Sequence, residues 1–382
     1  MNSVFYQLIR VSIGTQDSLS RLPSEREWGK LYKMAAKQSL VGVCFAGLQR
    51  LGANADDGFA NIGMSKMQYL TWMGQAVQIQ QKNELVNRQC AELQAKLSAD
   101  GYRSYIMKGQ ANASLYKVGN DDSVFSDLPA LRQSGDIDVY IEGGLEKVLA
   151  CADKYGGATG VNELEMHVKV FEDTEVEFHY RPFIMRNPFR NARLQRFFSD
   201  CAEKNFSNSV ILDSDKNIAL CAPTTEFNLV HQMVHIYHHL FTEGVGMRQL
   251  MDYYFVLKTL SSSPLKGECM ESTKKVINDL GLDTFASALM WVMQYAFGLG
   301  MIGMPWVPNQ RDGEFLLKEI MLSGNFGKQD KRQKGLYDSK WNSFWIVNGK
   351  ALRLARFDRW MWFWGPFWRV YHFVWRKAKR FE

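Results

Sequence analysis

Asp136 and Asp138 lie two residues apart in RQSGDIDVYIE (132–142), a stretch that otherwise has the pattern of a β-strand. Side chains of a strand alternate between its faces, so both carboxylates are predicted on one face, with Ile137 and Val139 on the other. Two like charges held side by side repel each other and contribute nothing to the stability of a sheet. A divalent cation bound between the carboxylates would remove that repulsion. The spacing therefore indicates a metal site.

A third carboxylate lies on the next polar strand pattern, EVEFHY (175–180), whose alternation places Glu177 and His179 on one face. If this strand lies beside the first, Glu177 can approach the aspartate pair. Three oxygen ligands suit Mg²⁺, with Mn²⁺ as the alternative. Two such ions can activate a hydroxyl group and stabilise a leaving oxygen in a displacement at phosphorus. An Asp-x-Asp pair alone is weak evidence, because exposed strands carry such pairs by chance.

A Lys-Gly corner precedes these strands: Lys108 and Gly109 follow the short β-like segment YRSYIM (102–107) and open a predicted helix. The segments IMKGQANASLY, RQSGDIDVYIE and EVEFHYRP together resemble the DNA polymerase β-type nucleotidyltransferase superfamily. Within it they resemble an uncharacterised bacterial group that has a Lys-Gly corner, an Arg-x-Ser-x-Asp-Ile-Asp strand and an acid-x-His strand. The resemblance covers roughly residues 1 to 260.

The resemblance implies a Mg²⁺-dependent enzyme that transfers a nucleoside monophosphate from an NTP such as ATP to a hydroxyl group of a small molecule, RNA or protein. Asp136 and Asp138 would bind the metal. Glu177 would take the place of the third acid, usually Asp in the superfamily, where it also helps to deprotonate the acceptor. The implied nucleotide-binding residues are Lys108, Gly109, Gln110, Arg132 and Ser134.

The position after the corner glycine departs from the superfamily pattern. A glycine lets the backbone approach the triphosphate, and the superfamily usually continues with Ser or Gly, whereas here Gln110 follows Gly109. A hydroxyl contact to phosphate is therefore missing, and Lys108 would replace it with a charge. For Arg132 and Ser134, a structural role in the turn is the alternative to phosphate binding.

Four histidines in HQMVHIYHH share one face of a predicted helix at i, i+4, i+7 and i+8: His231, His235, His238 and His239. A zinc site is disfavoured, because Gln232 stands where a zincin helix has its general-base Glu. Hydrogen-bonded packing groups are the simpler interpretation. The resemblance packs this helix against the catalytic unit, so His235 and His239, together with His179, are candidate contacts to acceptor or nucleotide.

The predicted fold class is α+β, with a small mixed-sheet nucleotidyltransferase core between two helical regions. Apolar residues recur at three- and four-residue spacing before Gly101 and again after Pro223, which indicates helices at both ends. Gly101 is placed to end the last N-terminal helix. We therefore predict an N-terminal helical region (1–100), the α/β core (101–215) and a C-terminal helical region (216–382).

The tail carries the positive charge of the chain. Residues 350–382 hold nine Lys or Arg against two acids, giving +7, so that the rest of the chain contributes −1 to the total of +6. Large aromatic residues interleave with these charges, which suits a membrane surface or RNA. The alternative is a helical subdomain whose aromatic residues form its core. We expect a break at Gly365-Pro366, core aromatics before it, and surface contact from Trp368 to Arg380.

Cytoplasmic localisation is expected. The six cysteines form no Cys-x-x-Cys pair, no apolar run reaches eighteen residues, and the first residues lack the pattern of an export signal. Two alternative functions remain open: a toxin-like nucleotidyltransferase of the abortive-infection type, and a degenerate nucleotide- or RNA-binding module. The three intact acids argue against a degenerate module, and the Gly109-Gln110 corner argues for it.

Overall fold

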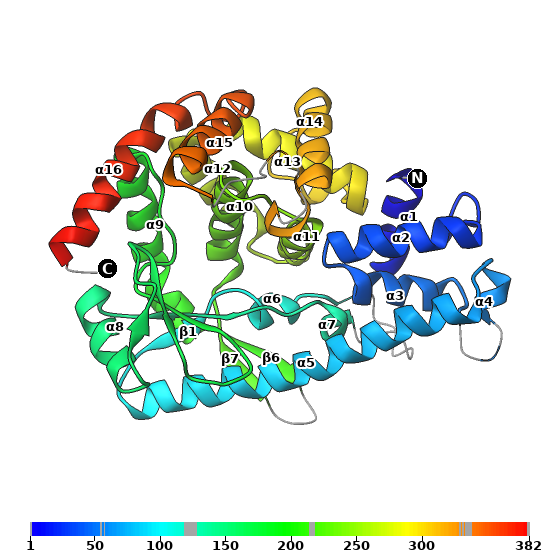
Figure 1. Cartoon of the computed structure of the whole chain (residues 1–382), viewed down its shortest axis with the longest axis horizontal. Coiled ribbons are helices and arrows are strands. Elements are labelled where there is room, and N and C mark those ends of the chain that lie inside the picture. The colour runs from blue at the N-terminus through cyan, green and yellow to red at the C-terminus, as the bar shows by residue number, and fades with distance from the viewer. Residues whose placement is uncertain are drawn as a thin grey trace.

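The computed structural model describes residues 2–53, 56, 58–117, 128–213, 218–327, 330, 332 and 338–379. It confirms the predicted α+β class, with a small sheet between two sets of helices (Figure 1). All six cysteines are free thiols. Among the described residues, no helix is both long and apolar enough to cross a membrane.

The N-terminal region is helical as predicted. Its last helix, α5, runs along one edge of the molecule beneath the sheet (Figure 1) and stops at Ala99, and Gly101 follows with a positive φ of 81°. That backbone conformation is the usual helix ending for which glycine is suited. The helices are α1 (Asn2–Ser12), α2 (Glu25–Lys37), α3 (Val41–Arg50), α4 (Gly58–Asn61) and α5 (Lys66–Ala99).

The sheet has five strands in the order β1-β2-β5-β4-β3. β2 and β5 are parallel, whereas β1 pairs with β2, β4 with β5 and β3 with β4 in antiparallel fashion, so the sheet is mixed as predicted. The elements of this part of the chain are β1 (Ser104–Ile106), α6 (Gln110–Ala113), α7 (Leu128–Leu131), β2 (Ile137–Ile141), α8 (Gly144–Asp153), β3 (Ala158–Thr159), β4 (Glu165–Val168) and β5 (Val176–His179).

The two faces of the sheet differ in polarity. Ile137, Val139 and Phe178 are buried in a core that also takes in Val86 and Cys90 of α5, together with residues of α8. This apolar face follows from the alternation of the strands. The acidic side chains of β2 and β5 therefore point the other way, toward the C-terminal helices, and the fold fixes the site on that side.

The part of the chain after β5 begins with a helix and a two-stranded ribbon and continues as helices. One hydrophobic core joins it to the N-terminal region, because Phe5 of α1 and Trp72 of α5 belong to the same buried cluster as Phe255 and Phe297. The predicted division into three domains stays a prediction. The elements are α9 (Pro188–Ser207), β6 (Ser209–Asp213), β7 (Ile218–Cys221), α10 (Thr225–Phe241), α11 (Met247–Ser261), α12 (Lys266–Asp279), α13 (Asp283–Phe297), α14 (Gln310–Ser323), α15 (Lys340–Arg353) and α16 (Met361–Lys379), with short 3₁₀ turns at Met301–Gly303 and Asn325–Gly327.

The tail differs from the sequence prediction in two ways. Helix α16 continues through Gly365-Pro366. The glycine before the proline carries no side chain to clash with the proline ring. Of the aromatics before Gly365, Phe357 is buried in the core as predicted, whereas Trp360 and Trp362 are each 49% exposed. Arg380, part of the predicted contact segment, lies outside the described residues.

Candidate active site

Acidic side chains from three neighbouring strands meet on the polar face of the sheet. Asp138 of β2 lies opposite Glu177 of β5, and Glu165 of β4 lies opposite His179 of β5. The imidazole Nε2 of His179 lies 3.1 Å from Asp138 Oδ1, 3.2 Å from Glu165 Oε2 and 3.5 Å from Glu177 Oε2. One ring thus bridges three carboxylates.

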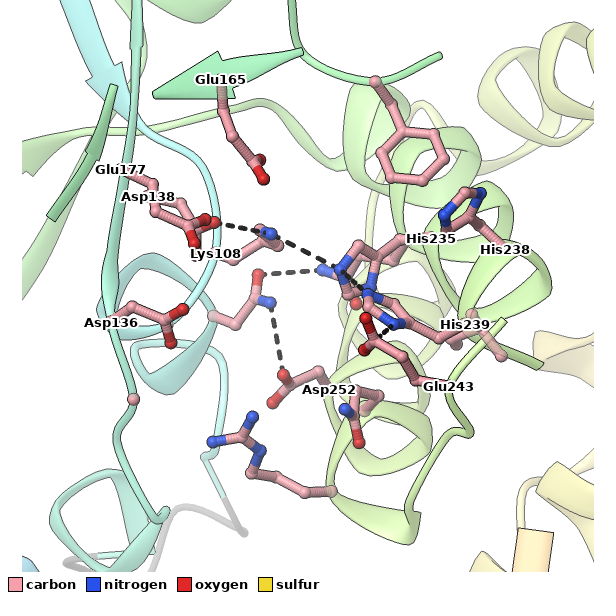
Figure 2. A pocket seen from close by; sticks show the side chains of 18 of the residues that line it. Lys108, Asp136, Asp138, Glu165, Glu177, His235, His238, His239, Glu243 and Asp252 are labelled. Atoms are coloured by element: carbon pink, nitrogen blue, oxygen red, sulfur yellow. Dashed lines mark hydrogen bonds and ion pairs between the residues drawn. The ribbon is translucent and has the colours of Figure 1, made fainter. Parts of the chain in front are cut away.

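Among the described residues, one group of side chains has the geometry to bind a metal. Asp138, Glu177 and His179 each offer a ligand atom, and these atoms lie within 4.8 Å of one another. Asp136 lines the same cavity (Figure 2) but precedes β2 and lies outside this group. The predicted adjacency of Asp138 and Glu177 is confirmed, whereas Asp136 as a metal ligand stays a prediction.

The two carboxylates of this candidate metal site, Asp138 and Glu177, lie in different electrostatic surroundings. Lys108 Nζ lies 2.6 Å from Asp138 Oδ1. Burial would raise the pKa of Asp138, but the charge of Lys108 and the hydrogen bond from His179 outweigh burial and hold it well below its usual range. Burial raises the pKa of Glu177, and the negative charges of Asp138 and Glu165 raise it further. Glu177 therefore lies in an excess of negative charge, where its oxygens fit a hard cation.

His179 lies behind the carboxylates and does not line the cavity. It is 1% exposed, and burial would lower its pKa, but Glu165, Asp138 and Glu177 outweigh burial and raise the pKa to about 9. With its Nε2 atom directed at three carboxylates, a protonated imidazole holds them together, which leaves the carboxylates as the metal ligands of this group. The predicted contact of His179 with nucleotide or acceptor is therefore not supported, because the ring is covered by the carboxylates.

The opposite wall of the cavity comes from the histidine helix α10 (Figure 2). The Nε2 atom of His235 lies 3.4 Å from Lys108 Nζ and 3.0 Å from His239 Nε2. Burial, followed by the nearby charge of Lys108, keeps the pKa of His235 well below its ordinary value, so this ring is neutral. His235 and His239 both line the cavity, while His231 is buried with its Nε2 atom 3.2 Å from the carbonyl oxygen of Pro182.

The Lys-Gly corner has the predicted position but not all of its predicted contacts. Gly109 lines the cavity with φ +58°, a conformation that other residues adopt only with strain. Gln110 is 2% exposed and its amide donates to Asn87 of α5, so the first residue of α6 points away from the cavity. Ser134 does not line the cavity either. The structure therefore does not support Gln110 and Ser134 as nucleotide ligands.

Arg132 lines the cavity, but an aspartate of α11 already holds it. Its Nε and Nη2 atoms each donate to Asp252 at 2.7 Å, and the hydroxyl of Tyr116 donates to the same carboxylate at 2.6 Å. Both charged side chains are buried. This bidentate pair attaches the segment before β2 to the helical region, and a phosphate contact from Arg132 stays a prediction.

Sequence reasoning missed several cavity residues. Glu165 could have been found, because ELEMHV alternates and places this acid on the face of His167, beside Glu177. Asn112 gave no such signal, and for Asp252 the sequence indicated only an intrahelical ion pair with Arg248, because the approach of both helices to the sheet depends on packing. Asn112 accepts a hydrogen bond from Gln232 at 2.9 Å, and both residues line the cavity.

The cavity measures about 350 Å³ and lies between the sheet and helices α10 and α11. A mixed sheet with an Asp-x-Asp strand, a facing acid on the parallel neighbour and a Lys-Gly corner defines the nucleotidyltransferase class that the sequence resembles. The model of the family described as "uncharacterised nucleotidyltransferase" matches residues 24–298. The chain belongs to that family and is a nucleotidyltransferase. No curated protein and no solved structure matches the chain.

Proposed function

We propose that the chain transfers a nucleoside monophosphate from a Mg²⁺-bound NTP to the hydroxyl group of an acceptor. The observation that supports this most is the pair of adjacent carboxylates, Asp138 and Glu177, which line one cavity together with Lys108, the direct partner of Asp138. These two acids, with Asp136 at the cavity edge, would hold the metal. When bound, the metal would neutralise phosphate oxygens and make the acceptor hydroxyl more acidic.

The protein side chains divide the remaining work. Lys108 is one-fifth exposed and has a flexible side chain. Its ammonium group can therefore leave its ion pair with Asp138 and bind a phosphate oxygen of the NTP. The acceptor oxygen bonds to the α-phosphorus as the bond from that phosphorus to the pyrophosphate oxygen breaks. Pyrophosphate leaves with the electron pair, and Glu177, whose pKa is raised by burial, accepts the hydroxyl proton.

The proposed transfer can be tested by following the α-phosphate of the NTP to its product. The protein is incubated with each NTP labelled at that phosphate, with Mg²⁺ or Mn²⁺, in a bacterial extract, and the labelled product is identified. Asp138→Asn should lower labelling by at least about 100-fold while the fold survives, and Asp153→Asn on exposed α8 is the matched control. No labelling by the folded native protein with any NTP would refute the proposal.

The same assay separates the two alternatives. A toxin-like enzyme would label a component essential for growth, and expressing the native protein but not Asp138→Asn would then arrest growth. A degenerate binding module would bind NTP without releasing pyrophosphate. The paired carboxylates and the nearby Lys108 favour an active enzyme, because nucleotide binding alone does not need two acids that repel each other.

We also propose that the tail contacts an anionic membrane surface. The solvent face of α16 is an apolar stripe at helical spacing, and the last turn adds Arg376, Lys377 and Lys379. Such a helix lies flat in a lipid interface with its charges beside the headgroups. The stripe consists of Phe363, Phe367, Val370, Tyr371 and Val374, which are 39–64% exposed.

Vesicles test this contact. Binding to vesicles with anionic lipid should weaken with salt and fall sharply in the Phe367→Ser/Val374→Ser variant, whereas Leu265→Ser, at an exposed apolar residue outside the tail, should bind normally. If the protein binds single-stranded RNA but not vesicles, the partner of the tail is RNA and not a membrane, because RNA bases can stack on the aromatic rings. Equal vesicle binding by both variants would refute the contact.

A further inference from the structure

A second, larger cavity of about 1230 Å³ lies beside the catalytic one. Its walls come from the segments around β4 and after β5, the end of α10, and the tail helices α15 and α16. The two cavities have a common wall, because five residues line both: Leu164, Glu165, Phe183, His238 and Glu243. A molecule bound in the second cavity can therefore reach the catalytic carboxylates.

Two arginines line this second cavity without a carboxylate partner. In the part of the chain that the structure describes, Arg186 Nε is buried and has no hydrogen-bond partner, and the guanidinium forms no ion pair. Arg369 of α16 donates to the carbonyl oxygen of Ser343 at 3.3 Å and lies 5.5 Å from the ring of Phe344. Burial and then the charge of Arg369 lower the pKa of Arg186 to about 10, the sign of a cation that lacks a counter-ion.

The acids that line the same cavity are engaged elsewhere. Glu163 pairs with His372 of α16. Glu165 lies 3.2 Å from His179, and Glu243 lies 3.5 Å from His239. Each carboxylate thus has a histidine partner. Arg376 and Lys377 also line the cavity, which leaves it with a surplus of positive charge.

The tail contributes four large aromatic side chains to the lining: Trp341, Phe344, Trp368 and Phe373. Flat rings beside guanidinium groups suit a ligand that has both a ring and an anionic group. The volume exceeds the range of roughly 300–1,000 Å³ that is usual for small-molecule sites, so a single sugar ring would leave most of the space unfilled. A pair of guanidinium groups matches a dianionic phosphate better than a singly charged carboxylate.

We propose that the second cavity binds the acceptor and that the acceptor is a phosphorylated, ring-containing small molecule. Its phosphate binds between Arg186 and Arg369, its ring lies against the tail aromatics, and its hydroxyl reaches the catalytic carboxylates past Glu165. The assignment of this ligand as the acceptor rests on the proposed nucleotidyl transfer, whereas the anion site rests on the two arginines alone.

Calorimetric titration with phenyl phosphate tests the anion site. Phenyl phosphate should bind more tightly than benzyl alcohol, which lacks the anion, and than inorganic phosphate, which lacks the ring. Arg186→Met and Arg369→Met should each weaken binding at least about tenfold, while Arg359→Met, an exposed tail arginine outside the cavity, should bind as the native protein does. Equal binding by all variants would overturn the site, and Arg369→Met keeps the test valid if Arg186→Met misfolds.

A second set of measurements separates this inference from the proposed function. Mg²⁺-ATP should not displace phenyl phosphate; displacement would make the cavity part of the nucleotide site and overturn the acceptor assignment. In the labelling assay, Arg186→Met should raise KM for the acceptor and leave KM for the NTP unchanged. Labelled RNA in place of a low-molecular-weight phosphorylated product would overturn the acceptor class. If Asp138→Asn labels normally while phenyl phosphate binding still depends on both arginines, the proposed function fails and the anion site stands.

Discussion

The two cavities treat charge in opposite ways. In the catalytic cavity, two cations lie against acids: Lys108 contacts Asp138, and Arg132 contacts Asp252. In the second cavity, Arg186 and Arg369 both line the wall, and neither has a carboxylate partner among the described residues. Buried charges that have partners hold a fold together, whereas buried like charges lower stability unless a ligand neutralises them. The first arrangement is therefore structural and catalytic, and the second fits a binding site.

The cavities also come from different parts of the chain. The residues that line the catalytic cavity fall between 108 and 252, inside the family match of 24–298. The second cavity takes much of its wall from residues 339–377, beyond that match. This division agrees with the proposals above: the family region carries out the chemistry, and the tail selects the acceptor.

The largest expected effect comes from breaking a charge pair of the catalytic cavity. Asp252→Ala should lower the free energy of unfolding by about 3–5 kcal/mol, because it leaves Arg132 buried without its partner. Denaturant titration measures the change, with Asp153→Ala on exposed α8 as the control that should shift stability by less than about 0.5 kcal/mol. A loss below about 1 kcal/mol for Asp252→Ala would mean that the pair does not hold the helices to the sheet.

Lys350 provides a pH test on the tail side. It is 2% exposed, donates to the carbonyl oxygen of Thr242 at 2.9 Å, and has its pKa lowered by burial to about 8. The unfolded chain, with a Lys pKa near 10.4, binds the proton more tightly, so this group destabilises the fold below pH 8 and the penalty fades as pH rises.

Lys350→Met removes that titration. The stability of the native protein relative to Lys350→Met should therefore rise by about 2 kcal/mol between about pH 7 and 9.5. Denaturation at each pH measures the difference, and Lys266→Met, in a half-buried lysine of α12, is the control. A difference that stays constant or falls with pH would contradict the burial of an uncompensated charge.

A backbone substitution probes the catalytic corner. Gly109→Ala should cost about 1–2 kcal/mol of stability, because a side chain disfavours its φ of +58°. It should raise KM for the NTP more than KM for the acceptor, since the corner lies in the catalytic cavity. Gly74→Ala, in an open position of α5, should be neutral or stabilising. An equal rise in both KM values would show a distorted fold instead.

The smallest expected effect is on stability, and it is a gain instead of a loss. Arg186→Met should leave stability unchanged or raise it by up to about 1 kcal/mol, because it removes a buried charge that Arg369 repels. The thermal midpoint measures this, and Arg132→Met in the catalytic cavity is the matched comparison that should be strongly destabilised. A marked loss of stability in Arg186→Met would show that the two cavities do not differ in the way described.

The sequence by itself determined the features that depend on local periodicity. Alternation placed Asp138 and Glu177 on the polar faces of two strands, and Gly101 marked the end of α5. These patterns are readable because side-chain direction follows from the repeat of a helix or strand. The α+β fold followed from these patterns, and the nucleotidyltransferase class from the resemblance of the three motif segments to that superfamily.

Only the tertiary structure decided which distant side chains meet. The register of the strands places Glu165 opposite His179. The packing of α11 brings Asp252 into contact with Arg132, which lies 120 residues away in the sequence. The orientation of α6 points the side chain of Gln110 toward Asn87 and away from the cavity. The position of α16 brought Arg369 to the cavity that Arg186 also lines. Contacts between such distant segments depend on how whole elements pack, and no short-range pattern in the chain encodes that packing.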